Sequence, residues 1–437
     1  MAVTQGLQSL LAVFVVAALT PLLVAALPGP RIPQVVFFLI GGVIIGPHAL
    51  GVADTTSVQL VANVGLGFLF LLAGYELEPA LLRQRAGRLA ITGWLTSVAL
   101  SLGAVAGLDA AGFVRDYVPV ALALTTTALG TLLPILHDNG MLGGDFGRYV
   151  FAAGAVGELF PIVAIAVFLS QGSHFTALLS VAAVGLLAVA LSAVPWIVRS
   201  ERLRTIISEG QNATGQVMLR WSVVLLFLLL VIAAKFGQDV VLGAMLAGIV
   251  LRTWTRRMGI DVGGLEEKFD AVGYGIFIPV FFISSGMTLD IGGIAGNPLR
   301  VIVFFLLLLV IRGLPSLLIY RRVLPLRQRV EMTFITATAL PLLVALAEIG
   351  LRDGKMLPSN AAALVGAGAL SVLVFPAIAT AMARTDRTRT ATEPSGPAEA
   401  AELGEAAEQA VAAEAAEPAE QVPRARHPAD GFMPWHR

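Results

Sequence analysis

A single glutamate, Glu158, lies in the middle of a long apolar segment. The segment from Tyr149 to Ser170 contains no other charged residue and is long enough to cross a bilayer as a helix. A carboxylate at the bilayer centre costs about 3 kcal/mol on insertion scales, so it normally faces a cavity, a partner or an ion path. Pro161 cannot donate a hydrogen bond to the carbonyl of Gly157, which leaves an oxygen beside the carboxylate. These oxygens predict a site for a proton and a monovalent cation.

Threonines coincide with helix breakers in two other apolar segments. Broken helices expose unpaired backbone groups and partial charges, which can coordinate an ion where lipid is absent. Threonine hydroxyls can also bond to their own helix, so a purely structural interpretation of the threonines stays open. The residues are Thr125, Thr126, Thr127, Gly130 and Pro134 in the first segment, and Thr336, Thr338 and Pro341 in the second.

Other ionisable residues in apolar segments have more ambiguous roles. Arg312 is the only basic residue inside a predicted span, and it could be an ionic partner of Glu158 or a structural residue. Glu76 lies at the end of its span, where we expect an interfacial or capping group. Glu348 lies deeper, but close to the outer end of another span, and could line a pathway.

The composition indicates a membrane protein. Hydrophobic residues make up 57% of the 437 residues and charged residues only 13%, far from the usual quarter charged of soluble domains. The 29 basic and 29 acidic residues balance, so nothing suggests a nucleic-acid partner. Cysteine is absent, which excludes disulfides and thiolate metal sites. We therefore predict an all-α polytopic membrane protein in contact with the lipid bilayer.

About thirteen transmembrane helices are expected, and the basic residues between them predict the orientation. Loops after odd-numbered spans carry seventeen Lys and Arg residues, against five after even-numbered spans. The positive-inside rule therefore places the N-terminus outside and the C-terminus in the cytoplasm of a multi-pass protein of the cell membrane. The spans begin near Leu7, Gln34, Val58, Leu89, Tyr117, Tyr149, Phe175, Trp221, Gln238, Ala271, Val301, Met332 and Asn360.

The chain contains an internal repeat. FLFLLAGYELE from Phe68 is similar to VFFISSGMTLD from Val280, with Gly74 over Gly286, and TTTALG is similar to TATALP. A weaker match sets LIGGVII at Leu39 over LAGIVL at Leu246. The two units start an odd number of spans apart, so we predict two inverted five-helix repeats whose broken helices cross at the site, as in secondary transporters.

This organisation predicts the domain boundaries. Residues 1–33 form an extra N-terminal transmembrane helix, 34–170 the first inverted repeat, 171–237 linking helices and 238–383 the second repeat. Residues 384–437 are rich in Ala, Glu and Pro, so we expect a disordered cytoplasmic tail.

Six segments, in order, resemble the membrane domain of the monovalent cation:proton antiporters, nearest their Kef-type branch. The resemblance covers roughly Pro33 to Ala383. The segments are PQVVFFLIGGVIIGPHALG, FLFLLAGYELEP, ALALTTTALGTLLPILHDNGML, GRYVFAAGAVGELFPI, VLGAMLAGIVL and IPVFFISSGMTLD.

The resemblance implies roles for particular residues. Thr127, next to Thr126, matches a threonine of the first crossing helix, and Glu158 matches the second member of an ion- and proton-binding pair. Gly157 stands where the family has the first member, a departure that removes a ligand. Arg312 matches a basic residue of a later core helix. One carboxylate with one exchangeable proton implies electroneutral exchange of Na⁺ or K⁺ for H⁺ by alternating access, in a homodimer and without a cofactor.

Other function classes stay open in different degrees. A cation channel would use the same broken helices but would need no titrating carboxylate. A Kef-like potassium efflux protein is a further alternative, although no dinucleotide fingerprint is found, so we expect no nucleotide-binding regulatory domain. An enzyme is not indicated, because no span combines a nucleophile with a base, or His with carboxylates at the spacing of metal ligands.

Overall fold

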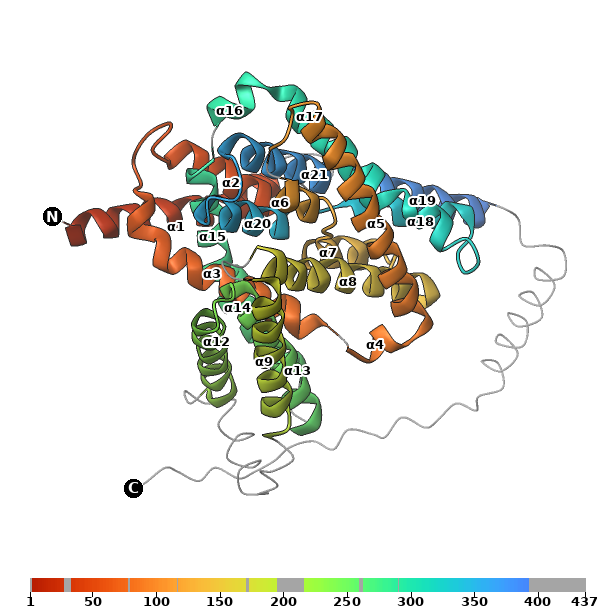
Figure 1. The fold of residues 1–437 in the computed structure, drawn as a ribbon, viewed down its shortest axis with the longest axis horizontal. Helices are drawn as coiled ribbons and strands as arrows, with labels where there is room; N and C mark the ends of the chain where they lie inside the picture. Colours follow the sequence, from red (N-terminus) through yellow and green to blue (C-terminus); the bar gives the residue numbers. More distant parts are fainter. Residues whose placement is uncertain are drawn as a thin grey trace, which may run out of the picture. The chain divides into compact units, whose positions relative to one another are not determined.

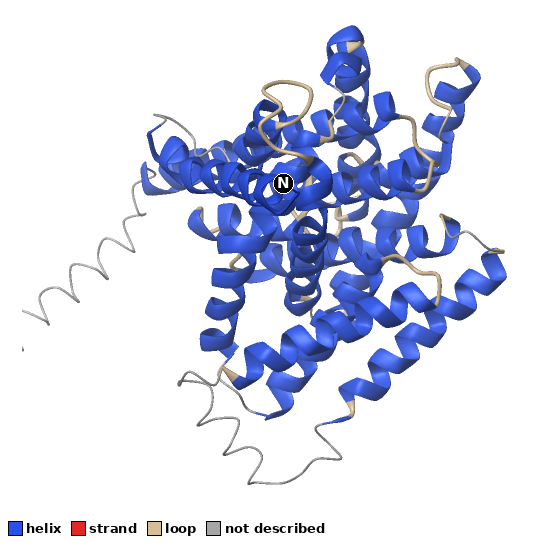
Figure 2. Cartoon of the chain, turned by 90° about the vertical axis from the view of Figure 1, so that its left-hand side faces the viewer, coloured by secondary structure: helices blue, strands red, loops and turns tan. Residues whose placement is uncertain are grey.

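The computed structural model describes residues 2–26, 33–77, 79–115, 117–169, 173–194, 216–258, 262–289 and 291–392. Two units are distinguished, residues 1–384 and residues 385–437. Within the described ranges every regular element is a helix, and Figure 2 shows no strand. Most of the predicted tail, residues 393–437, lies outside the description, but the last helix extends to Thr392, beyond the expected boundary at residue 383.

The first half of the chain forms long apolar helices separated by short turns. Two of them begin at N-caps: the Asp54 carboxylate accepts from the N–H of Ser57, and the Ser173 hydroxyl accepts from the N–H of Thr176. The helices are α1 (Ala2–Ala26), α2 (Gln34–Ile45), α3 (Thr55–Glu76), α4 (Pro79–Arg83), α5 (Arg85–Ala110), α6 (Tyr117–Ala123), α7 (Leu129–Asp138), α8 (Gly144–Phe168) and α9 (His174–Ser192).

The second half is also helical but contains two π-helical segments, η1 and η2. Each is followed closely by a proline, Pro279 or Pro315, whose missing N–H disturbs the regular helical ladder. The elements are α12 (Val217–Lys235), α13 (Val240–Met258), α14 (Val262–Val272), η1 (Gly273–Phe277), α15 (Ile278–Met287), α16 (Ile291–Gly296), α17 (Pro298–Leu307), η2 (Leu308–Gly313), α18 (Pro315–Ile319), α19 (Leu326–Ala337), α20 (Pro341–Arg352) and α21 (Pro358–Thr392).

Ten helices in the described ranges are long and apolar enough to cross a membrane. The three remaining predicted spans coincide with less regular elements. α2 has only 12 residues, α6 and α7 are two short helices, and α13 ends in Arg256 and Arg257. Helices are therefore present where the sequence predicted these three spans, but they are shorter or more polar than the ten long apolar helices.

Residues 1–384 contain two groups of packed helices. In one, α3 packs against α13 and α15, α15 packs against α2, and α9, α12 and α13 lie side by side (Figure 1). In the other, α8 packs against α5, α6, α7 and α19, and α19 also packs against η2 (Figure 1). The second group contains the broken helices.

Glycines allow the same close packing to form twice in the first group. A Cβ at Gly74 would lie 2.1 Å from the Met245 carbonyl oxygen, and one at Gly248 would lie 2.1 Å from that of Leu71. A Cβ at Gly286 would lie 2.2 Å from the Leu39 oxygen. Only glycine permits these backbone contacts. The corresponding contact of α2 is made by Gly42, 2.0 Å from the Ile283 oxygen. Gly42 therefore corresponds to Gly248, one residue away from the weak sequence match.

Candidate functional site

The two interrupted helices meet at their breaks. α6 ends at Ala123 and α7 begins at Leu129, while α19 ends at Ala337 and α20 begins at Pro341. The N–H of Ala128 donates to the carbonyl of Thr338 at 2.9 Å. The Thr127 hydroxyl donates to the carbonyl of Thr336 at 2.7 Å. The two breaks therefore form hydrogen bonds with each other, which pairs backbone carbonyls that a regular helix would otherwise pair. This crossing is buried inside the protein.

Glu158 lies on α8 beside the crossing, and its exposed fraction is 6%. One carboxylate oxygen, Oε1, accepts hydrogen bonds from the N–H of Leu129 at 2.8 Å and of Gly130 at 3.5 Å. These are the first residues of α7, whose N-terminal partial charge favours an anion. The other oxygen, Oε2, is buried and has no hydrogen-bond partner among the described residues. A buried carboxylate oxygen without a partner can take up a proton or contact a cation.

The sequence predicted that the carbonyl oxygen of Gly157 is left unpaired beside Glu158, but this oxygen has a partner. It accepts a hydrogen bond from the N–H of Thr127 at 3.0 Å. Pro161 does lie in α8, which continues as a helix around it. The carbonyl that the proline leaves without its helical partner therefore fastens α8 to the break between α6 and α7.

The absence of a side chain at Gly157 has a physical reason. A Cβ at this position would lie 2.7 Å from Nη2 of Arg312 and 2.7 Å from Cβ and Oγ1 of Thr127. Contacts this short essentially never occur. Arg312 and Thr127 therefore fill the space that a side chain of the first member of the family's ion- and proton-binding pair would need. The glycine that departs from the family pattern thus makes room for the guanidinium of Arg312.

Arg312 binds the crossing. Its Nε donates to the Thr127 hydroxyl at 2.8 Å and its Nη2 donates to the Ala153 carbonyl at 2.9 Å. No ion pair between Arg312 and Glu158 is found among the described residues. The guanidinium lies on η2, where the N–H of Leu314 donates to Leu309 in the wider π-helical pattern. Its contacts are those of a structural residue at the crossing, and a direct ionic partnership with Glu158 stays a prediction.

The threonines and helix breakers differ in what they contact. The hydroxyls of Thr125, Thr126 and Thr338 bond to their own helices, at Leu122, Ala123 and Phe334. Thr127 alone of the triple uses its hydroxyl across the crossing. Gly130 lies inside α7, so the first break comes a few residues earlier than Gly130 and Pro134 suggested, whereas Pro341 begins α20 as the sequence indicated.

A second carboxylate, Glu76 at the end of α3, faces the same region. The nearest atoms to a Cβ at Gly130 would be the Tyr274 hydroxyl at 3.7 Å and Glu76 Oε2 at 3.9 Å. The oxygen of Glu76 is buried and has no hydrogen-bond partner among the described residues, and Glu158 is among its nearest charges. The expectation of an interfacial or capping role overlooked this placement, because a helix end in sequence can face either lipid or protein.

Another residue that the sequence did not single out supports the second break. Ser371 of α21 accepts from the N–H of Ala339 at 3.1 Å and is fully buried. Its signal in the sequence is weak, since one serine in an apolar helix is ordinary. Within the described ranges no group of three His, Cys, Asp or Glu side chains is placed to hold a metal ion.

Comparison with known proteins gives a consistent family. The chain matches the family described as sodium/hydrogen exchanger, transmembrane, over residues 13–385. It is 25% identical over 371 residues to the putative Na⁺/H⁺ antiporter YjbQ of Bacillus subtilis, covering 79% of this chain and 58% of that protein. It is 28% identical to cation/H⁺ antiporter 17 of Arabidopsis thaliana, covering 66% of this chain and 37% of that protein.

Two further comparisons concern a potassium-efflux protein and a solved structure. The chain is 27% identical to the glutathione-regulated potassium-efflux system protein KefC of Escherichia fergusonii, covering 64% of this chain and 45% of that protein. The chain therefore spans about half the length of the curated relatives it matches. The structure of the sodium proton antiporter MjNhaP1 of Methanocaldococcus jannaschii is similar with a TM-score of 0.64 at 18% identity, covering 88% of this chain and 99% of that one. The fold is thus shared.

Proposed function

The chain belongs to the transmembrane sodium/hydrogen exchanger family, and we propose that it exchanges a monovalent cation, Na⁺ or K⁺, for H⁺ at Glu158. The observation that carries the proposal is the unpartnered Oε2 of a buried carboxylate whose other oxygen is fixed at the start of α7. A proton and a cation compete for such an oxygen, because either one neutralises the charge that burial disfavours. This competition couples the two fluxes.

We propose alternating access as the mechanism, with the two five-helix repeats related by inversion. The doubled glycine packing, α3 on α13 and α15 on α2, supports the repeats. The crossing, fixed by Thr127 and Arg312, would move as one body with α8 and carry Glu158 between the two sides. The cell-membrane location, the external N-terminus, the homodimer and the set of thirteen spans remain proposals from the sequence.

We also propose that exchange is electroneutral. Gly157 contributes no charge, and Arg312 is hydrogen-bonded within the crossing, so Glu158 alone would exchange one proton for one cation. Glu76 must then keep the same charge throughout the cycle. A potential acts only on net charge, by about 2.3 kcal/mol per elementary charge per 100 mV. We therefore expect equal exchange rates in vesicles with and without an imposed potential at fixed ion gradients.

A potential-dependent rate would show that a second titrating group takes part, and Glu76 is the nearest candidate. Placing an acid at Gly157, where the family has the first member of the pair, is a poor test of electroneutral exchange. The side chain of a Gly157→Asp variant would collide with Arg312 and Thr127, so a change in rate could come from packing alone.

The direct test is Glu158→Gln in the full chain, reconstituted in vesicles and assayed for proton movement after addition of Na⁺ or K⁺. We expect exchange to fall by at least about a hundredfold, since glutamine neither releases a proton nor carries a charge to hold a cation. Glu267→Gln is the matched control, because Glu267 is an exposed carboxylate on α14. Rates like those of the wild type in a folded Glu158→Gln protein would refute the assignment.

The same assay separates the alternative functions. The similarity to a relative named as a potassium-efflux protein favours K⁺ as the second candidate substrate, so each ion is tested alone. A cation channel would carry current down the ion gradient without proton movement, and Glu158→Gln would not be expected to abolish that current.

A further inference from the structure

A polar cavity lies away from Glu158, between α8, α12, α13 and α20. Its volume is about 290 Å³. Apolar residues form part of its lining, among them Ile165 of α8, Leu169 directly after α8, and Ile349 of α20. The polar part of the lining consists of Gln238, Asp239, Arg352 and Asp353.

Gln238 is the first sign that the cavity takes a polar occupant. The residue is 6% exposed, and neither Oε1 nor Nε2 of its amide has a hydrogen-bond partner among the described residues. Buried amides normally have partners. The position of Gln238 is fixed by the turn that ends α12, where Gly237 adopts a φ of 68°, a conformation that glycine tolerates best.

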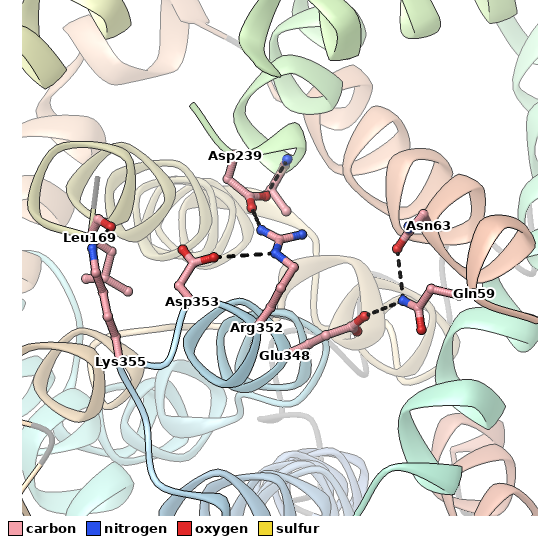
Figure 3. A network of polar contacts seen from close by, with 9 residues as sticks. Gln59, Asn63, Leu169, Asp239, Glu348, Arg352, Asp353 and Lys355 are labelled. Carbon is pink, nitrogen blue, oxygen red and sulfur yellow. Dashed lines mark hydrogen bonds and ion pairs between the residues drawn. The ribbon is translucent and has the colours of Figure 1, made fainter. Parts of the chain in front are cut away.

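Arg352 is the second sign, because its guanidinium lies between two carboxylates. Nη2 contacts Oδ2 of Asp239, and Nε donates to Oδ1 of Asp353 at 3.5 Å. Figure 3 shows the side chains of Asp239, Arg352 and Asp353 pointing toward one another. Asp239 belongs to the start of α13 and Arg352 to the end of α20. A tethered positive charge therefore joins the start of α13 to the end of α20.

The oxygens around this charge form the donor set of a hard monovalent cation. They are the carboxylates of Asp239 and Asp353 and the unpartnered Oε1 of Gln238. Arginine keeps its charge at all accessible pH values. If it moves away, two carboxylates are left together, which is unfavourable unless another cation replaces it.

The cavity and Glu158 share helix α8, and the cavity lies toward the end of the molecule opposite Glu76. Ile165 follows Glu158 on α8 by seven residues, about 10 Å along the helix. The same end contains Gln59, near the start of α3, which contacts Glu348 one turn before Arg352. Glu76 is the last residue of α3, so the cavity and Glu76 belong to opposite ends of the molecule.

We propose that this cavity is a second binding site for the monovalent cation, and that Arg352 occupies the cation's place until the cation displaces it from Asp239 and Asp353. The inference rests on the proposed function for the identity of the cation. Displacement also releases the tie between α13 and α20, so arrival of the cation would open the path toward Glu158.

The test measures binding rather than transport. Thermal unfolding of the full chain in detergent is followed in NaCl, in KCl and in choline chloride at equal ionic strength, since a ligand that binds the folded state raises the Tm. All variants are made in the Glu158→Gln background. We expect Glu158→Gln to retain a rise in Tm with Na⁺ or K⁺ over choline, and Asp239→Asn in that background to lose most of it.

Asp54→Asn is the matched control. Asp54 and Asp239 each accept a backbone N–H at the start of a helix, from Ser57 and Val241, and asparagine preserves such a cap. The control should therefore retain the cation-dependent rise in Tm. An equal rise with and without Asp239→Asn, or no rise in Glu158→Gln at all, would overturn the second site. Persistent exchange by Glu158→Gln would refute the proposed function but leave this result unaffected.

The Arg352→Gln variant tests whether Arg352 occupies the cation's place or only joins α13 to α20. Removing the guanidinium leaves Asp239 and Asp353 for the ion, so the Na⁺ or K⁺ concentration at half of the maximal rise in Tm should fall about tenfold. Arg352→Lys retains a tethered charge and should stay close to the value of the Glu158→Gln background. An unchanged or higher concentration in Arg352→Gln would show that Arg352 only joins the helices, and the proposal would be wrong.

Discussion

The glutamates found at the two ends of α3 differ in their hydrogen bonding. At the last residue of the helix, Glu76 has a buried oxygen without a partner among the described residues. Near the first turn, about 25 Å away along the helix, Gln59 donates to Glu348 Oε1 at 3.2 Å, and the Ser285 hydroxyl donates to its Oε2 at 3.4 Å. Figure 3 shows Glu348 pointing toward Gln59. The same side chain type is unsatisfied at one end and hydrogen-bonded on both oxygens at the other.

The difference shows that two similar helix–helix contacts can have different polar neighbours. The close packing of Gly74 on α13 at one end corresponds to that of Gly286 on α2 at the other. Next to these glycines, one end carries the carboxylate of Glu76 and the other carries the hydroxyl of Ser285. A carboxylate facing Glu158 can attract a cation, whereas a hydroxyl bound to Glu348 holds α15 and α20 together. The Glu76 end therefore offers a carboxylate oxygen without a hydrogen-bond partner among the described residues, whereas the carboxylate of Glu348 is held by two hydrogen bonds.

Glu76→Gln should produce the largest change in this comparison. It removes an ionisable carboxyl that lies close to Gly130 and interacts electrostatically with Glu158. At an effective dielectric constant of about 20, a charge several ångströms away is worth a few kcal/mol, so we expect the exchange rate to fall by about tenfold or more. Initial rates in vesicles at saturating Na⁺ or K⁺ measure this, with Glu267→Gln as control. A rate equal to that of the wild type would return Glu76 to the interfacial role that its position in the sequence suggested.

Glu158 and the two breaks could be found in the sequence because their signals are local. A carboxylate within an apolar span is costly wherever the span packs, and Pro341 cannot continue the helix that precedes it. The contacts of Arg312 could not be found in this way. Its choice of Thr127 and Ala153 over Glu158 depends on the space left by Gly157, and that space exists only after three helices have packed.

Glu76 escaped prediction for a related reason. The end of a transmembrane helix can face lipid headgroups, water or another helix, and the apolar pattern of α3 is the same in each case. Glu348 lies in α20, one turn before the end of that helix, but Gln59 and Ser285, which bind it, come from α3 and α15. Such partners are distant in sequence and carry no motif of their own, so they can be identified only in the structure.

Glu348→Gln should produce a smaller change than Glu76→Gln. The substitution keeps the shape of the side chain and an oxygen that accepts from Gln59, but weakens hydrogen bonds made to a charge. Losing about 0.5–1 kcal/mol of the tie between α20 and its neighbours should loosen the contact of α20 with α3 and α15. We expect the exchange rate to change by less than about fivefold, with the free energy of unfolding only slightly lower.

The comparison fails if the two Glu→Gln variants behave alike. A Glu348→Gln protein that loses exchange as completely as Glu76→Gln would mean that both carboxylates act on the ion. The Gln59→Leu variant helps to separate the two cases, because it removes the hydrogen bond but leaves the charge of Glu348 in place. A tie predicts similar effects of Gln59→Leu and Glu348→Gln, whereas an ion-binding role predicts that only Glu348→Gln lowers the rate.

The smallest expected effect concerns Asp54, at the Gln59 end of α3 but before the span begins. The hydroxyls of Thr56 and Ser57 donate to its carboxylate, and with the N–H of Ser57 they hold the pKa of Asp54 below its usual value of 3.8. A lowered folded-state pKa means that the ionised carboxylate stabilises the fold above the unfolded pKa, and that this contribution is lost as the pH falls through the folded value. Lowering the pH from about 5 to about 3 should therefore decrease the Tm of the wild type slightly more than that of Asp54→Asn. Thermal unfolding in detergent at both pH values measures the difference. Equal decreases would show that Asp54 contributes its cap to α3 without a charge-dependent part, and that the pH sensitivity of this end comes from another group.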